Sequence, residues 1–130
     1  MQRTKYILSV VFGLILLIAG FKHFQSPASY YPFIPGFMPA VLSNYLGGAA
    51  ELILGIGLFI PAYRHLAALG VLLLMVLFLP LHVIDAFRAH PAIGSKTIAY
   101  IRLPLQFVLI AWAWWISKKD QLNASTYVHD

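Results

Sequence analysis

The sequence predicts an all-α integral membrane protein: a four-helix bundle with an aromatic, proline-rich loop between its first two helices. Apolar residues make up 61% of the 130 residues and charged residues only 10%. A soluble chain of this size would lack the polar residues needed to cover its surface. Four apolar blocks also approach the roughly 20 residues that a helix needs to cross the hydrocarbon core. Because a backbone in lipid must satisfy its own hydrogen bonds, each block is expected to be a helix.

The predicted spans cover about residues 6–24, 45–60, 66–87 and 97–117, in one domain (1–117) followed by a polar cytoplasmic tail (118–130). The first block is predicted to be a retained helix rather than a signal peptide, since no small-residue cleavage site follows it. The second block is short and can begin inside the preceding loop. The third and fourth contain Pro80 and Pro104, each of which removes a backbone donor and can kink its helix.

The loop between the first two blocks, Gln25–Val41, contains four prolines and cannot form a regular helix. Its aromatic side chains, including Tyr30 and Phe33, are too apolar for a loop that lies free in water. We therefore expect it to lie over the outer mouth of the bundle. It would act there either as an aromatic anchor among lipid headgroups or as a lid.

The distribution of charge bears on orientation and on partners. An even number of spans places Arg3, Lys5, Arg64, Lys118 and Lys119 on one side and Lys22, Arg88 and Lys96 on the other, which favours cytoplasmic termini. The net charge of +5 comes from dispersed cations, which argues against a nucleic-acid partner. The absence of cysteine excludes disulfides, thiolate metal sites and thiol nucleophiles from this chain.

Polar side chains from every predicted helix meet at one level, in the outer half of the bundle. An ionised side chain within a span costs several kcal/mol unless it is paired or hydrated, so these groups are expected to face the interior. Lys22, Arg88 and Arg102 can instead extend their charged ends to the membrane–water interface. The layer consists of Lys22, His23, Glu51, His82, Asp85, Arg88, Arg102 and Gln106.

Spacing within single helices refines this layer. His82 and Asp85 are three residues apart and share a face, so the carboxylate can hold the imidazole as a cation, or the two can share a ligand proton. Gly48, Glu51 and Gly55 also share one face. Because small residues let helices approach closely in lipid, Glu51 is expected to face a neighbouring helix.

Several segments resemble the DoxX-like family of small bacterial membrane proteins across residues 15–90. They are AGFKHFQSP, IPGFMP, GGAAELILGIGLFIPAYRHLAALG and FLPLHV. The resemblance implies a four-helix bundle in the bacterial cytoplasmic membrane. It also implies a link to redox systems, since the family is named for a subunit of a thiosulfate:quinone oxidoreductase. Many members have Ser-Gly where this chain has Gly47–Gly48, and asparagine where it has His82.

Three classes of function fit the polar layer. The first is an accessory membrane protein that binds a small amphipathic or quinone-like molecule, with membrane lipid and a redox subunit or a second copy as partners. The second is an enzyme in which His82, Asp85 and Glu51 transfer protons and Arg102 stabilises an anion. The third is a metal or haem site. The candidate ligand-binding residues are Lys22, His23, Glu51, His82, Asp85, Arg102 and Gln106, and the candidate metal ligands are His23, His82, Glu51 and Asp85.

Overall fold

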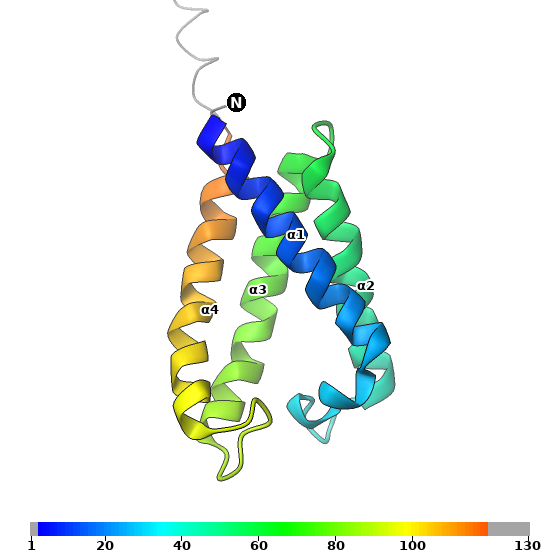
Figure 1. Cartoon of the computed structure of the whole chain (residues 1–130), viewed down its shortest axis with the longest axis vertical. Coiled ribbons are helices and arrows are strands. Elements are labelled where there is room, and N and C mark those ends of the chain that lie inside the picture. Colours follow the sequence, from blue (N-terminus) through cyan, green and yellow to red (C-terminus); the bar gives the residue numbers. More distant parts are fainter. Residues whose placement is uncertain (1–2, 120–130) are drawn as a thin grey trace, which may run out of the picture.

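The computed structural model describes residues 3–119 and is all-helical over that range, apart from its turns and loops. Its four long helices are α1 (Arg3–Gln25), α2 (Ala40–Phe59), α3 (Arg64–Phe87) and α4 (Lys96–Ser117). Each is long and apolar enough to cross a membrane. Figure 1 shows the helices side by side, with the start of α1 and the end of α4 together at one end, here called the terminal end. The opposite end, which holds residues 26–39 and 88–95, is called the polar end.

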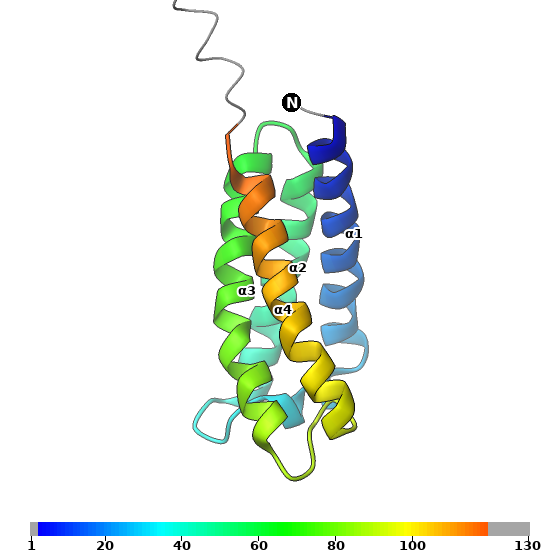
Figure 2. The same cartoon turned by 90° about the vertical axis from the view of Figure 1, so that its left-hand side faces the viewer.

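The helices pack mainly as two pairs. α1 packs along α2 and α3 packs along α4, whereas α2 and α3 make a smaller contact and α1 touches α4 only slightly. Figure 1 shows α1 close to α4 at the terminal end and diverging from it toward the polar end. The view turned by 90° shows α4 crossing in front of the other helices (Figure 2). The axes of α1 and α4 therefore lie farther apart at the polar end than at the terminal end.

Glycines allow the close contact between α1 and α2. A Cβ atom added to Gly13 would lie 3.0 Å from the carbonyl oxygen of Gly55, and one added to Gly20 would lie 3.0 Å from that of Gly48. The two backbones thus approach each other directly, as glycine-containing helix pairs do in lipid. The prediction that the glycine face of the second helix meets a neighbour is confirmed, and Glu51 on that face is buried.

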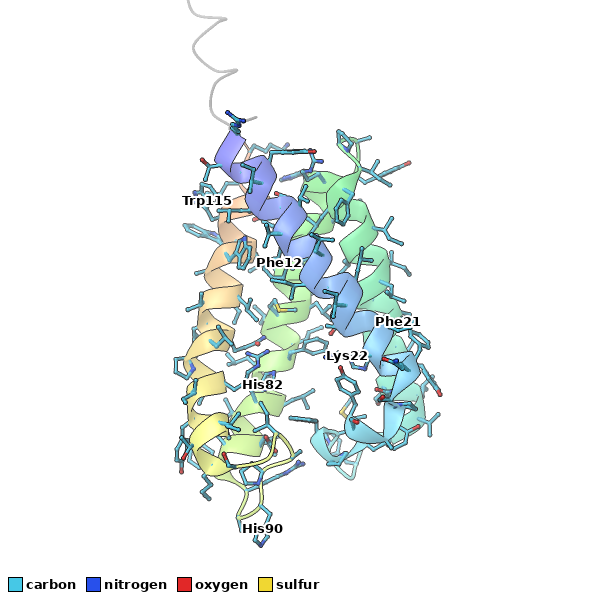
Figure 3. The ribbon with its side chains drawn as sticks, in the orientation of Figure 1. Phe12, Phe21, Lys22, His82, His90 and Trp115 are labelled. Atoms are coloured by element: carbon cyan, nitrogen blue, oxygen red, sulfur yellow. The ribbon has the colours of Figure 1, made fainter. Side chains whose placement is uncertain are left out.

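The apolar core occupies the half of the bundle nearer the terminal end. Phe12 packs edge-on against Trp112, with ring centroids 4.7 Å apart. In Figure 3, Phe12 and Trp115 lie toward the terminal end, while Lys22 and His82 lie toward the polar end. The fully buried members of this core include Phe12, Leu58, Ala68, Val71 and Ala113.

Cations at the terminal end bind backbone carbonyls. The Arg64 side chain donates hydrogen bonds from Nε to the Leu58 carbonyl at 2.7 Å and from Nη2 to the Phe59 carbonyl at 3.2 Å. It thereby stabilises the C-terminus of α2, where unpaired carbonyls favour a cation. Lys5 donates to the carbonyl of Lys118 and so links the start of α1 to the end of α4.

The helix bounds match the predicted spans except at the start of α2. This helix begins at Ala40 rather than Tyr45, directly after Pro39. Proline is well tolerated there because the first helical turn needs no backbone donor. The preceding loop contains only short 3₁₀ turns, η1 (Pro27–Ser29) and η2 (Tyr31–Phe33). Most of the predicted tail, residues 120–130, lies outside the described residues.

Candidate functional site

The predicted polar residues all lie toward the polar end, but the structure divides them into two groups. His23 and Glu51 belong to a group between α1 and α2, and Lys22 lies beside it. The second group lies on α3, α4 and their connection. Its members are His82, Asp85, Arg88, Arg102 and Gln106. The single layer expected from the sequence is thus two neighbouring clusters.

The first group is centred on the buried imidazole of His23. Its Nδ1 atom lies 2.7 Å from Asn44 Oδ1, and Asn44 Nδ2 donates to the His23 carbonyl at 3.0 Å. On the other side of the ring, Nε2 lies 3.5 Å from Glu51 Oε1. The second carboxylate oxygen of Glu51 is buried and has no hydrogen-bond partner among the described residues. Both imidazole nitrogens therefore face an oxygen supplied by α2.

Asn44 was missed by the sequence analysis, which left it between the loop (Gln25–Val41) and the second predicted span (45–60). The residue is almost completely buried and lies on the same helical face as Gly48, Glu51 and Gly55. These four positions follow the spacing i, i+4, i+7 and i+11, which keeps side chains on one face of a helix. That spacing was the signal that could have identified Asn44.

His23 is held by Tyr30 stacked on its ring and by Gly48 against its Cβ atom. The ring of Tyr30 stacks on it with centroids 3.8 Å apart and planes inclined by 16°. On the α2 side, a Cβ atom added to Gly48 would lie 2.6 Å from His23 Cβ, so only glycine fits. Burial raises the pKa of the Tyr30 phenol, and the negative charge of Glu51 raises it further. Tyr30 therefore lies within the electrostatic influence of the carboxylate.

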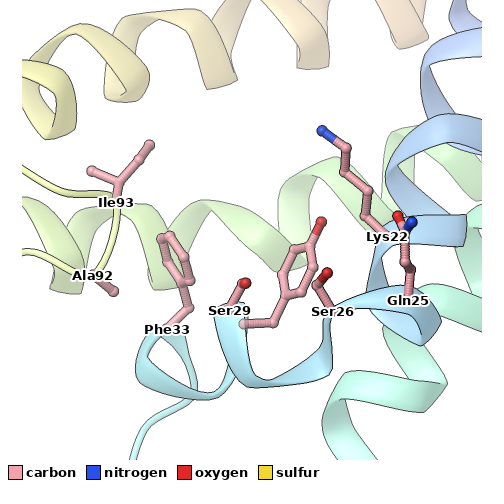
Figure 4. Close-up of a pocket in the computed structure, with 8 residues that line it drawn as sticks. Lys22, Gln25, Ser26, Ser29, Phe33, Ala92 and Ile93 are labelled. Atoms are coloured by element: carbon pink, nitrogen blue, oxygen red, sulfur yellow. The ribbon is translucent and has the colours of Figure 1, made fainter.

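A pocket of about 420 Å³ opens beside this group (Figure 4). Lys22 from α1 extends into it, Tyr30 from the proline-rich loop is part of its lining, and Phe33 and Ile93 form an apolar wall. Among the described residues Lys22 forms no ion pair, and no carboxylate lines the pocket. Its lining consists of Lys22, Gln25, Ser26, Ser29, Tyr30, Phe33, Ala92 and Ile93.

Asp85 holds the α3–α4 connection in place. Its carboxylate accepts hydrogen bonds from the backbone N–H of Ala92 at 2.6 Å and of Ile93 at 3.2 Å, and Oδ1 lies 3.4 Å from Arg88 Nη1. Arg88 in turn donates to the carbonyl of Pro32 in the proline-rich loop. The carboxylate thus supports one wall of the pocket and, through Arg88, fastens the loop across the end of α3.

The expected contact between His82 and Asp85 is replaced by other contacts. Among the described residues no hydrogen bond joins the two, because the carboxylate is directed at the backbone of the α3–α4 connection. His82 instead lies edge-on to Phe33, with centroids 6.5 Å apart. Gln106 donates to the Met75 carbonyl at 2.7 Å and joins α4 to α3. Within residues 3–119, no three His, Asp or Glu side chains gather as a metal site requires.

Arg102 extends the second group further along α4. Its Nη1 atom is buried, and no hydrogen-bond partner for it is present in the described part of the chain. Oε1 of Gln106, one helical turn away, is also buried and has no hydrogen-bond partner among the described residues. Neither residue lines the pocket, so the polar groups available to a molecule bound there are those of Lys22, Gln25, Ser26, Ser29 and Tyr30.

Comparison with known proteins yields one match. A family model described as a domain of unknown function (DUF8561) matches residues 12–117, which include most of α1 and all of the other three long helices. No curated protein and no solved structure matches the chain. The function must therefore be argued from the site.

Proposed function

The chain belongs to the DUF8561 family, and from its site we propose that it is a multi-pass membrane protein that binds a small amphipathic molecule with a quinone-like head. The observation that carries this proposal is the pocket at the polar end. Its volume of about 420 Å³ lies within the usual range of small-molecule sites, roughly 300–1,000 Å³.

The exterior of the bundle supports a membrane location. Large apolar side chains on all four helices are exposed, including Ile18 (60%), Ile53 (69%), Leu73 (61%) and Ile101 (63%). In water such a surface would be unfavourable, whereas lipid chains cover it at no cost. We place the protein in the bacterial cytoplasmic membrane with both termini in the cytoplasm. The excess of lysine and arginine at the terminal end supports this orientation.

The chemistry of the pocket supports a head that carries electron-rich oxygens. The Lys22 ammonium, the Ser29 hydroxyl and the Tyr30 hydroxyl are hydrogen-bond donors, and no carboxylate competes for them in the lining. Phe33 and Ile93 offer an apolar surface for a ring. A quinone-like molecule has both features.

The resemblance to the DoxX-like family supports a place for this binding site in a redox system. The chain has no nucleotide-binding or flavin-binding motif. We therefore propose that it acts as an accessory subunit, with a separate partner that carries the electrons. Isolation of a redox subunit bound to the full chain from native membranes would support this assembly, and recovery of the chain alone would count against it.

The binding proposal is tested with decylubiquinone and the purified full chain, by calorimetric titration in detergent. Lys22→Gln removes a charged donor from the pocket, and charge-assisted hydrogen bonds contribute about 1.5–3 kcal/mol, so we expect about a tenfold or greater loss of affinity. Lys96→Gln is the matched control, because Lys96 is exposed, lies at the same end and is absent from the pocket lining. Equal affinities of the two variants, or no binding by the wild-type protein, would contradict the proposal.

A further inference from the structure

The hydrogen bonds around His23 determine where one of its protons lies. Asn44 donates from Nδ2 to the His23 carbonyl, which leaves its Oδ1 atom facing His23 Nδ1 at 2.7 Å. An amide oxygen can only accept a hydrogen bond, so Nδ1 must carry a hydrogen. Any further proton on the ring is therefore bound at Nε2.

The Nε2 atom faces a carboxylate, so one more proton is held between the two residues. Nε2 lies 3.5 Å from Glu51 Oε1. The proton can reside on the ring, giving imidazolium and carboxylate, or on the carboxyl, giving two neutral groups. Loss of this proton would leave the lone pair of His23 Nε2 facing the buried negative charge of Glu51. Because unpaired buried charges are costly, the protonated pair is the favoured resting state.

Glu51 retains hydrogen-bonding capacity on its other oxygen. The residue is only 5% exposed, yet Oε2 has no partner in the described part of the chain. Buried polar atoms are normally paired, and a carboxylate oxygen without a donor is poorly stabilised as an anion, so the pair favours keeping its proton. The titratable groups near the pair are Lys22 on α1 and Tyr30 in the proline-rich loop. The α3 residue that approaches the same part of α2 is Phe78, which does not titrate.

We propose that His23 and Glu51 form a buried proton-binding site, and that an amphipathic molecule with a proton-accepting oxygen binds in the adjacent pocket while the pair carries this proton. An electron-rich oxygen near Lys22 and Tyr30 disfavours additional negative charge on the pair, so binding favours the protonated form. Affinity then falls as pH rises through the titration of the pair. This coupling rests on the proposed binding function, whereas the shared proton itself does not.

The shared proton is tested without a ligand, by nitrogen NMR of the full chain labelled at histidine. We expect one buried histidine signal to be absent in His23→Gln and to titrate at a different pH in Glu51→Gln. Replacing the exposed His90 with Gln should leave that signal unchanged. If the signal of His23 is the same in Glu51→Gln as in the wild-type protein, the shared proton is disproved. Unchanged helical circular dichroism shows that each variant is folded.

The coupling is tested by titrating decylubiquinone and decanoate, which carry carbonyl and carboxylate oxygens respectively, between about pH 5 and pH 9, below the ionisation range of lysine and tyrosine. If binding requires one proton on the pair, the affinity of the wild-type protein should fall by up to about tenfold for each unit of rising pH. In Glu51→Gln the fall in affinity is expected at a different pH, the one at which the His23 signal of that variant titrates. If affinity falls with rising pH for only one of the two probes, that probe carries the kind of head group that the site accepts.

The two proposals fail in different ways. If a probe binds equally well at every pH, the coupling is disproved and the binding function stands. If neither probe binds, the binding function and the coupling are both contradicted, while the histidine spectrum still decides whether the pair shares a proton.

Discussion

Individual buried polar residues differ in what they bind. Arg64 and Gln106 donate to backbone carbonyls and join elements of the fold, as Asp85 does by accepting from backbone N–H groups. His23 and Glu51 bind each other, and the carboxylate keeps one oxygen unpaired. Replacing Arg64, Gln106 or Asp85 is expected to affect the stability of the fold. Replacing His23 or Glu51 can also affect ligand binding and its dependence on pH.

Replacing Asn44 tests the role of the residue that the sequence analysis missed. Asn44→Ala removes two hydrogen bonds from a buried site and leaves Nδ1 of His23 without its acceptor. An unsatisfied buried group costs about 1–3 kcal/mol, so we expect a loss of that size in the free energy of unfolding, measured by denaturation in mixed micelles. Ser43→Ala is the control, because Ser43 makes no side-chain hydrogen bond within residues 3–119 and should cost little. Equal stability of the two variants would contradict the structure at this point.

The raised pKa of Tyr30 predicts a loss of stability at alkaline pH. Its pKa lies above the ordinary value of 10.0 because burial and then the Glu51 charge disfavour the phenolate. The folded state therefore retains this proton more strongly than the unfolded state does. The stabilisation is complete below about pH 10 and is lost as pH rises through the folded pKa.

Comparison with Tyr30→Phe isolates this effect. The wild-type protein should lose stability more steeply than Tyr30→Phe above about pH 10, in unfolding experiments at a series of pH values. In absorbance titrations, Glu51→Gln should lower the pKa of Tyr30 because it removes a negative charge. A parallel loss in wild type and Tyr30→Phe would show that the phenol is not perturbed.

At the scale of elements, glycines set the distance between α1 and α2, and Asp85 and Arg88 set the position of the loops. The His23 ring fits only because Gly48 lacks a side chain on the facing surface of α2. Arg88 ties η2 to the end of α3 through the Pro32 carbonyl. The pocket thus lies between the end of α1, the proline-rich loop and the α3–α4 connection, and the last two are fastened by Asp85 and Arg88.

Adjacent glycines in α2 provide a matched test of this packing. A Cβ added to Gly48 would lie 2.6 Å from His23 Cβ, so Gly48→Ala must displace α1 and should destabilise the protein by about 1–3 kcal/mol. At Gly47 the nearest atom is 3.8 Å from the added Cβ, an ordinary contact. Gly47→Ala should therefore be neutral, or stabilising by up to about 1 kcal/mol, because alanine favours helix. Similar melting temperatures for the two variants would rule out this close packing.

At the scale of the whole molecule, the two ends of the bundle are specialised. The terminal end contains the packed apolar core and carbonyl-bound cations, whereas the polar end contains the His23 group and the pocket. The apolar core and the polar contacts around the pocket thus lie mainly in different halves of the bundle.

The membrane arrangement predicts which loops share a side. Because the chain contains no cysteine, single cysteines can be labelled without background. In cells, Gly36→Cys and His90→Cys at the polar end should react with a membrane-impermeant thiol reagent, and His65→Cys at the terminal end should react only after permeabilisation. Gly36 has open space for a side chain, and His65 and His90 are exposed. Labelling of all three in intact cells would contradict the proposed topology.

Much of the fold follows from patterns within single helices. The length and composition of the apolar blocks predicted all four helices, because these features depend only on the residues of each segment. The spacing of Gly48, Glu51 and Gly55 predicted a face that meets another helix, since helical periodicity is also local. The alternation of helix direction placed the polar groups at one end. The sequence allowed the second helix to begin inside the preceding loop, but it did not identify Asn44, which resembles a loop residue until its partner is known.

Contacts between distant segments were decided by the tertiary structure alone. The sequence indicated a His82–Asp85 pair from their spacing, but the carboxylate binds the backbone of the α3–α4 connection, whose path no local pattern reveals. The pairing of His23 with Asn44 and Glu51 depends on how closely α1 approaches α2. The sequence by itself therefore determined the helices and the level of the polar residues. The packing of helices and loops determined which of those residues bind one another and where the pocket opens, because these distances are set through space rather than along the chain.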